Sequence, residues 1–244
     1  FIGVDAVQNA VINAGAGTIS YTGGYTGNGI NVGVDDTGID TAHPDLSVVG
    51  SVSATAPNTH GTHVAGIIAG TGTQSNQNNA AGVNNGGTAF QWRGMAPQAG
   101  LIDSSNLVNL DNLYNAINNF SLDISNHSHI LGTDGNYNAS NQITDQAIRG
   151  GGTSGGNAVP RRPQVYAAAN NGTGNQYGSV IEYFSLLNQL KNAIVVGNWN
   201  ANANAIRGSS SLGPAYDGRI KPDVMAPGTN IISPGTTGDG ECAP

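Results

Sequence analysis

Three side chains in this sequence stand where regular structure would present them to a reacting group. Asp36 follows a short apolar strand, and the polar turn at the carboxyl end of such a strand is where open α/β sheets place their chemistry. His60 opens the run 60–70, whose small and apolar residues favour a helix packed tightly into a core. Asn171 lies two positions after the apolar run 165–169, and its amide could donate a hydrogen bond into a cleft.

Structural alternatives stand beside these chemical interpretations. Asp36 could merely stabilise a turn, because Asp side chains accept hydrogen bonds from nearby backbone N–H groups. His63 follows His60 by three positions, whereas the paired histidines of metalloproteases lie four apart with a glutamate between them; we therefore expect His63 to serve packing. His127 and His129 alternate on a strand and share a face. Without a third ligand, a substrate-side or solvent position is favoured over a metal site.

Short apolar strands alternate with helical segments along the chain, which is the pattern of a mainly parallel sheet with right-handed crossovers. We expect a three-layer α/β/α sandwich that forms a single domain over residues 1–244. Strands are expected at 30–35, 100–103, 124–128, 164–169 and 193–196, and helices from 60, at 110–120, 142–149 and 183–190. Residues 71–91 and 132–162 are predicted to be surface excursions, because they are rich in Asn, Gln, Gly or Pro.

Composition excludes several classes of partner. The chain has 8 Lys and Arg against 15 Asp and Glu, a net charge of −7, so binding to nucleic acid is not expected. The sequence contains no run of eighteen apolar residues, so a membrane-spanning helix is not expected. Only 9% of residues are charged, well below the usual quarter, which we interpret as the surface of a secreted, extracellular protein. Phe1 is not followed by a signal-like segment, so a processed protein is expected. Cys242 is the single cysteine, which excludes an internal disulfide.

Several sequence blocks resemble one protein family. Asp36-Thr37-Gly38, the block His-Gly-Thr-His-Val-Ala-Gly at 60–66 and the turn at Asn171 occur in the order found in the subtilisin-like serine proteases, the subtilases. Further matches are His43-Pro44-Asp45-Leu46, Gly94-Met95-Ala96-Pro97, Asn126-His127-Ser128 and the run 217–228. The resemblance spans nearly the whole chain and implies a subtilisin-like sheet.

The resemblance implies peptide-bond hydrolysis through an acyl-enzyme, with no cofactor needed for the chemistry. His60 would act as the general base, Asp36 would orient its ring, and Asn171 would donate to the oxyanion. The segments that would bind the polypeptide substrate contain Ser128, His129, Ala168, Ala169 and Asn170. Asn170 replaces the family's small residue and His129 its glycine, so substrate preference cannot be carried over.

The family's nucleophile segment, Gly-Thr-Ser-x-Ala, does not occur in these 244 residues. Ser154 follows Gly152 and Thr153, but the glycines and prolines after it cannot continue as the helix that holds a nucleophile. Residues 209–211 are three serines that match a structural loop of the family. Loss of the serine lowers kcat of subtilisin about a millionfold, so we expect this chain alone to be nearly inactive.

Two functional hypotheses follow. In the first, the chain is the larger part of a secreted serine endopeptidase, and a complementary polypeptide carries the catalytic serine. In the second, it is a catalytically inactive subtilase-like module that binds peptides. We favour the first, because an inactive module has no physical reason to keep an acid, a base and an oxyanion donor together.

Two further residues depart from simple expectations. Many subtilases bind a structural calcium through an aspartate that matches Asp45, but here the loop after the His60 helix has Asn76, Asn78 and Asn79 and no carboxylate. The prediction of a calcium site at Asp45 therefore rests on this one aspartate. Asp35 stands where the family has an apolar residue, and strand alternation points it into the core, where a bare carboxylate is costly. We expect it to have a partner.

Overall fold

The computed structural model describes residues 4–79, 81–133, 135–172 and 185–236. The chain divides into two compact units: unit 1 comprises residues 1–106, 118–123 and 231–244, and unit 2 comprises residues 107–117 and 124–230. Each unit is built around parallel strands. The expectation of a single domain over 1–244 stays a prediction.

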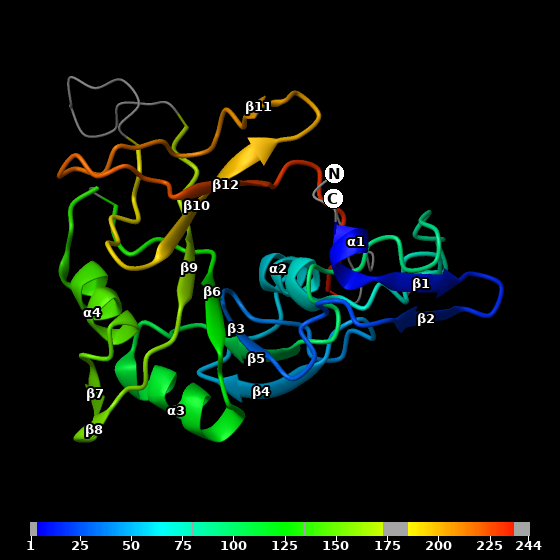
Figure 1. The fold of residues 1–244 in the computed structure, drawn as a ribbon, viewed down its shortest axis with the longest axis horizontal. Coiled ribbons are helices and arrows are strands. Elements are labelled where there is room, and N and C mark those ends of the chain that lie inside the picture. The colour runs from blue at the N-terminus through cyan, green and yellow to red at the C-terminus, as the bar shows by residue number, and fades with distance from the viewer. Residues whose placement is uncertain (1–3, 80, 134, 173–184, 237–244) are drawn as a thin grey trace. The chain divides into compact units, whose positions relative to one another are not determined.

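Unit 1 contains three parallel strands (Figure 1). β5 (Gly100–Ser104) pairs on one side with β3 (Asn31–Asp35) and on the other with β4 (Val48–Val52). The middle of β3 and most of β5 are buried, as expected for strands covered on both faces. The register brings Asp35 beside Ser104, and the Asp36 N–H donates to the Ser104 carbonyl at 2.9 Å.

Helix α2 (Thr59–Ala69) packs against β3 and β5. Asn58 caps it, because its side-chain oxygen accepts from the His60 N–H at 2.9 Å. The buried face consists of small residues: Gly61, Thr62, Ala65, Gly66 and Ala69. A Cβ atom at Gly61 would lie 2.4 Å from the Gly38 carbonyl oxygen, so the glycine allows the helix to contact the turn after β3.

The N-terminal part of unit 1 was not expected from the sequence. α1 (Val4–Gln8) is followed by a hairpin of β1 (Ala10–Asn13) and β2 (Thr18–Tyr21), shown in Figure 1. The available signal was a short apolar run at 10–12 and an alternating run at 18–21, on either side of a Gly-containing turn.

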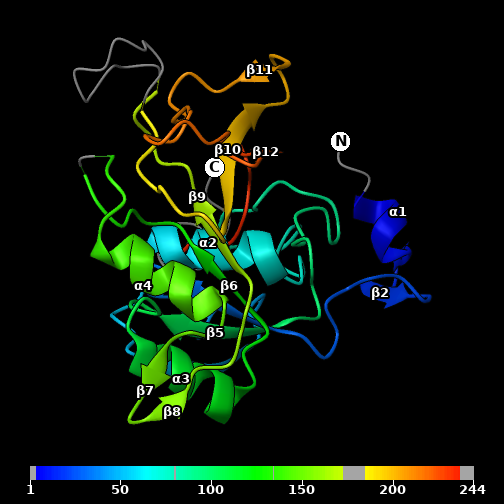
Figure 2. The same ribbon diagram turned by 60° about the vertical axis from the view of Figure 1, so that its left-hand side comes forward.

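Unit 2 contains parallel strands in the order β6 (Ile124–His127), β9 (Gln164–Ala167) and β10 (Ile194–Asn200). β12 (Val224–Pro227) also pairs with β10 in parallel, and β11 (Ala205–Ile206) pairs with it antiparallel (Figure 2). One buried apolar cluster of this unit comprises Tyr166, Ala168, Leu186, Leu190, Ala193, Val195 and Ala215.

Two longer helices lie where apolar spacing predicted them. α3 (Leu110–Phe120) matches its expected bounds, and α4 (Ala139–Ile148) begins three residues earlier than expected because Asn138 caps it through the Asn141 N–H at 3.0 Å. α4 is followed by a hairpin of β7 (Thr153–Ser154) and β8 (Asn157–Ala158), seen in Figure 2. Within the described ranges, none of the helices has the combination of length and apolar character that crossing a bilayer requires.

The helix expected at 183–190 is wrong for residues 185–190, the part of it that the structure describes. Residues 183–184 lie outside the described residues, and residues 185–190 form no regular structure. Leu186 and Leu190 are both fully buried and lie four residues apart. This spacing is the reason why a helix was predicted. Their backbone instead serves neighbouring loops: the Leu187 N–H donates to the Ala168 carbonyl at 3.5 Å. Tertiary hydrogen bonds therefore replaced the helical ones.

Replacing Gly61 with Ala should lower the free energy of unfolding by about 1–3 kcal/mol, the usual cost of overpacking, because the new Cβ would collide with Gly38. Thermal unfolding of the Gly61→Ala protein would measure the loss. Gly208→Ala is the matched control, since a Cβ there meets no atom within 4 Å. Equal melting temperatures for the two variants would contradict the packing role of Gly61.

Candidate functional site

Asp36 and His60 form a hydrogen-bonded pair in unit 1. The His60 Nδ1–H donates to Asp36 Oδ1 at 2.6 Å. Only 2% of the Asp36 side chain is exposed, whereas 59% of the His60 side chain is exposed. The pair thus has a buried acid and an imidazole that solvent or a substrate can reach, which is the arrangement that orients a general base.

Thr37 joins the acid to the helix that carries the base. Its N–H and its hydroxyl both donate to Asp36 Oδ1, at 2.7 and 3.1 Å. The Thr37 hydroxyl oxygen also accepts from the Gly61 N–H at 3.2 Å. Asp36 therefore does stabilise its turn, as the structural alternative proposed, and it holds His60 at the same time.

The turn after β3 is also anchored from β5. The Ile39 N–H donates to Asp103 Oδ1 at 3.2 Å. Burial raises the pKa of Asp103 to about 6, and the bond from Ile39 opposes that rise. Asp103 was not identified from the sequence, because nothing in the local pattern distinguishes it from any strand residue.

Pairing lowers the pKa of Asp36 and raises the pKa of His60, so it favours the charged form of each side chain. Burial alone would raise the pKa of Asp36, but the hydrogen bonds from His60 and Thr37 outweigh it and hold the pKa below its usual value. The hydrogen bond to Asp36 raises the pKa of His60, with burial opposing it and the charge of Asp36 adding to the rise. An imidazolium beside this carboxylate is therefore stabilised.

The turn that carries Asn171 lies in unit 2, after β9. Ser211, which is fully buried, holds the turn at two points: its N–H donates to the Ala169 carbonyl at 2.9 Å, and its hydroxyl oxygen accepts from the Asn171 N–H at 3.0 Å. Ala169 has a φ of 94°, a strained conformation for a residue with a side chain. The loop at 209–211 is thus structural, as expected, and its support of Asn171 was not foreseen.

The segments expected to bind substrate follow β6 and β9 in unit 2. His129 is partly buried and its ring lies edge-on to Tyr166, with ring centroids 5.9 Å apart. Ser128 accepts a hydrogen bond from Asn126 at 3.0 Å. The residues after β9 run from buried to exposed: Ala168 is 2% exposed, Ala169 is 9% exposed and Asn170 is exposed.

One expectation for the histidine strand is wrong. His127 shares a face with His129, with ring centroids 5.5 Å apart, but it is fully buried and not on a substrate or solvent side. Its ring stacks on Tyr166 at 4.1 Å between centroids, because the register places the two residues opposite each other. Its Nε2 lies 2.7 Å from the Ser125 hydroxyl.

Other polar residues have structural settings. His63 Nε2 lies 3.0 Å from the Ile231 carbonyl oxygen, in keeping with the expected packing role. Asp35 is fully buried, as alternation predicted, and it is not without a partner. Ser154 lies in the β7–β8 hairpin, and not at the start of a helix, so it lacks the setting of a nucleophile.

Asp45 is surrounded by hydrogen-bond donors. Its Oδ1 accepts from the hydroxyls of Thr71 and Thr73 at 2.8 and 2.5 Å and from the Gln74 N–H at 3.2 Å. Calcium instead requires six to eight oxygen ligands that face the ion. No cluster of three or more His, Cys, Asp or Glu includes Asp45 among the described residues. In this arrangement the residues do not fit a calcium ion at Oδ1, and Asp45 anchors the loop.

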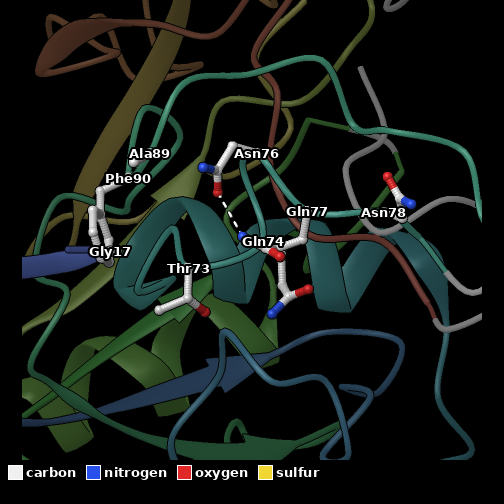
Figure 3. Close-up of a pocket in the computed structure, with 8 residues that line it drawn as sticks. All are labelled: Gly17, Thr73, Gln74, Asn76, Gln77, Asn78, Ala89 and Phe90. Carbon is white, nitrogen blue, oxygen red and sulfur yellow. Dashed lines mark hydrogen bonds between the residues drawn. The ribbon is translucent and has the colours of Figure 1, made fainter. Parts of the chain in front are cut away.

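The same loop lines a pocket, shown in Figure 3. Thr73, Gln74, Asn76, Gln77 and Asn78 surround it with polar side chains, together with Gly17, Ala89 and Phe90. None of these residues belongs to the predicted catalytic or substrate-binding set. Most of the pocket wall is thus formed by the loop that Asp45 anchors through Thr73 and Gln74.

The pKa of His60 should lie above about 6.5, the value of an unperturbed histidine, and Asp36→Asn should lower it. The variant removes the hydrogen bond and charge that raise the pKa and leaves the burial that lowers it. An NMR pH titration of the His60 ring would measure both values. Thr37→Ser keeps the hydroxyl and serves as the control. An unchanged His60 pKa in Asp36→Asn would contradict the pairing.

Asp45→Ala should lower the melting temperature equally with calcium and with a chelator, because it leaves three donors without their acceptor. Asp45→Asn retains an acceptor and should lose less. Thermal unfolding under both conditions gives the result. A melting temperature of the unmodified protein that rises with calcium, with the rise abolished in Asp45→Ala, would instead establish the predicted calcium site.

Comparison with known proteins agrees with these motifs. The model of the subtilase family of peptidases matches residues 27–243. Subtilisin NAT of Bacillus subtilis subsp. natto is 33% identical over 236 residues, which cover 89% of this chain and 52% of that protein. A subtilisin of Bacillus pumilus is also 33% identical, with 72% of its length covered. The chain spans about half the length of several of these relatives.

Solved structures show the same fold. The prenylagaramide maturation protease PagA has a TM-score of 0.59 at 19% identity, covering 99% of this chain and 74% of that one. A cold-adapted subtilisin-like serine proteinase has a TM-score of 0.53 at 18% identity, covering 95% and 73%. The expected α/β sandwich with a mainly parallel sheet is thereby confirmed. With its motifs, its parallel strands and the matched family model, this chain belongs to the subtilase family of serine peptidases.

Proposed function

We propose that the chain provides the acid, the base and the oxyanion donor of a serine endopeptidase that hydrolyses polypeptides through an acyl-enzyme. The nucleophilic serine would come from a segment outside these 244 residues. The observation that carries the proposal is the 2.6 Å hydrogen bond between buried Asp36 and exposed His60. It leaves the Nε2 side of the imidazole available to accept a proton.

In this mechanism His60 Nε2 removes the proton of the serine hydroxyl as that oxygen attacks the peptide carbonyl. The hydrogen bond to Asp36 fixes the tautomer and stabilises the imidazolium. The Asn171 side chain donates to the oxyanion, and Ser211 supports its backbone. His60 then returns the proton to the leaving amine.

We also propose that the protein acts outside the cell, on polypeptide substrates. The low content of charged residues, 9%, and the kinship with bacterial subtilisins support this. The second hypothesis, an inactive peptide-binding module, predicts saturable peptide binding without hydrolysis. No contact of the described residues favours it over the first.

A fluorophosphonate, which reacts covalently with activated serines, should label the native protein. Peptide mapping should place the label on a serine outside residues 1–244. His60→Ala should abolish labelling, whereas Ser154→Ala should not. Only neutral His60 can accept the proton, so the labelling rate should fall as the pH drops below the His60 pKa. Because this pKa is raised, the fall should begin at a pH above about 6.5, the value of an unperturbed histidine.

Two outcomes would refute the protease assignment. Native protein that is not labelled, but binds peptides saturably, would establish the inactive module. A label on Ser154 would place the nucleophile in the β7–β8 hairpin and overturn the roles given to the segments above.

A further inference from the structure

A single buried amide joins the segment after β6, which is expected to bind substrate, to the last residue of β9, which directly precedes the other expected segment. Asn188 is fully buried and lies in the irregular segment that replaces the expected helix. Its Nδ2 donates to the His129 carbonyl at 2.9 Å and to the Ala167 carbonyl at 2.7 Å. Its Oδ1 accepts from the Leu131 N–H at 2.9 Å.

These contacts occur where the sheet stops providing partners. β6 ends at His127 and β9 ends at Ala167, with the two strands in parallel register. Beyond these ends, backbone groups must find other partners when they are buried. Asn188 satisfies one group of β9 and two groups of the segment after β6. An asparagine side chain offers both donors and an acceptor, which no other side chain of its size does.

Other contacts hold the same segments to the core of unit 2. Asn138, the cap of α4, donates through Nδ2 to the Leu131 carbonyl at 2.7 Å. The Leu187 N–H donates to the Ala168 carbonyl, and the Ser185 hydroxyl donates to the Gly172 carbonyl. Asn188 is the member of this network that contacts both the segment after β6 and the end of β9.

We propose that substrate binds in a groove between 128–131 and 167–171, and that Asn188 is a positioning residue that sets the width of this groove and thereby the size of substrate side chain that it accepts. The inference rests on the proposed function, because it takes these segments as the substrate site. Binding sites hold their geometry to within about 0.5 Å through such supporting hydrogen bonds. A change of one methylene in a side-chain pocket alters selectivity about 10–200-fold.

The test uses two fluorescent peptides that differ only in a C-terminal Ala or Phe, which bind as cleavage products and need no serine. Fluorescence anisotropy with the full native protein gives the ratio of the two dissociation constants. Asn188→Asp keeps the size of the side chain but loses both donated hydrogen bonds, so it should change this ratio about tenfold or more. Asn188→Ser, which keeps one donor and one acceptor, should change it in the same direction and is available if the aspartate variant fails to fold.

Gln189→Glu is the matched control. Gln189 is also buried, at 1% exposed, and makes hydrogen bonds to the Leu186 carbonyl and the Tyr216 N–H, but the contacts lie outside both segments. It should lower the melting temperature without changing the ratio, so a general loss of stability is separated from an effect on the groove.

The outcomes separate this inference from the protease assignment. An unchanged ratio in folded Asn188 variants, an equal change in Gln189→Glu, or no saturable peptide binding by the native protein would each overturn the role of Asn188. Fluorophosphonate labelling of the native protein would leave the protease assignment standing in those cases. An Asn188-dependent ratio without any labelling would support the groove and refute the protease.

Discussion

The close approach of helix α2 to the turn after β3 is the constraint on which the catalytic pair depends. Gly61 lies so near the Gly38 carbonyl that no Cβ fits between them. Gly38 itself has a φ of 103°, which favours glycine. The two glycines of the family motifs thus have one physical reason, since they allow His60 to reach a carboxylate held on the neighbouring turn.

The two members of this pair differ in burial, and each stabilises the charged form of the other. Asp36 is almost completely buried and receives three hydrogen bonds at one oxygen, from His60 and from Thr37. His60 is largely exposed. A buried carboxylate stays charged only if its hydrogen bonds outweigh the cost of burial, and here the partner that stabilises it is also the base that needs orienting.

Unit 2 uses a different device, in which hydrogen bonds from remote segments shape the turns after its strands. Ser211 fixes the backbone of Asn171, and Asn188 joins the segment after β6 to the end of β9. Ala169 keeps a strained φ at this place, and its carbonyl is held by Ser211. Strain of this kind persists only where the surroundings determine the conformation.

The sequence by itself determined the strands β3, β5, β6, β9 and β10, the helices α2, α3 and α4, and the residues that could act as acid, base and oxyanion donor. Apolar runs, caps and motifs report local structure, and these elements are local. Only the tertiary structure decided the rest. Leu186 and Leu190 have helical spacing but fill a core without a helix, and His127 is buried because Tyr166 lies opposite it. The supporting residues Ser211 and Asn188 act through bonds to backbone groups that folding alone brings within reach, so no spacing along the chain records them.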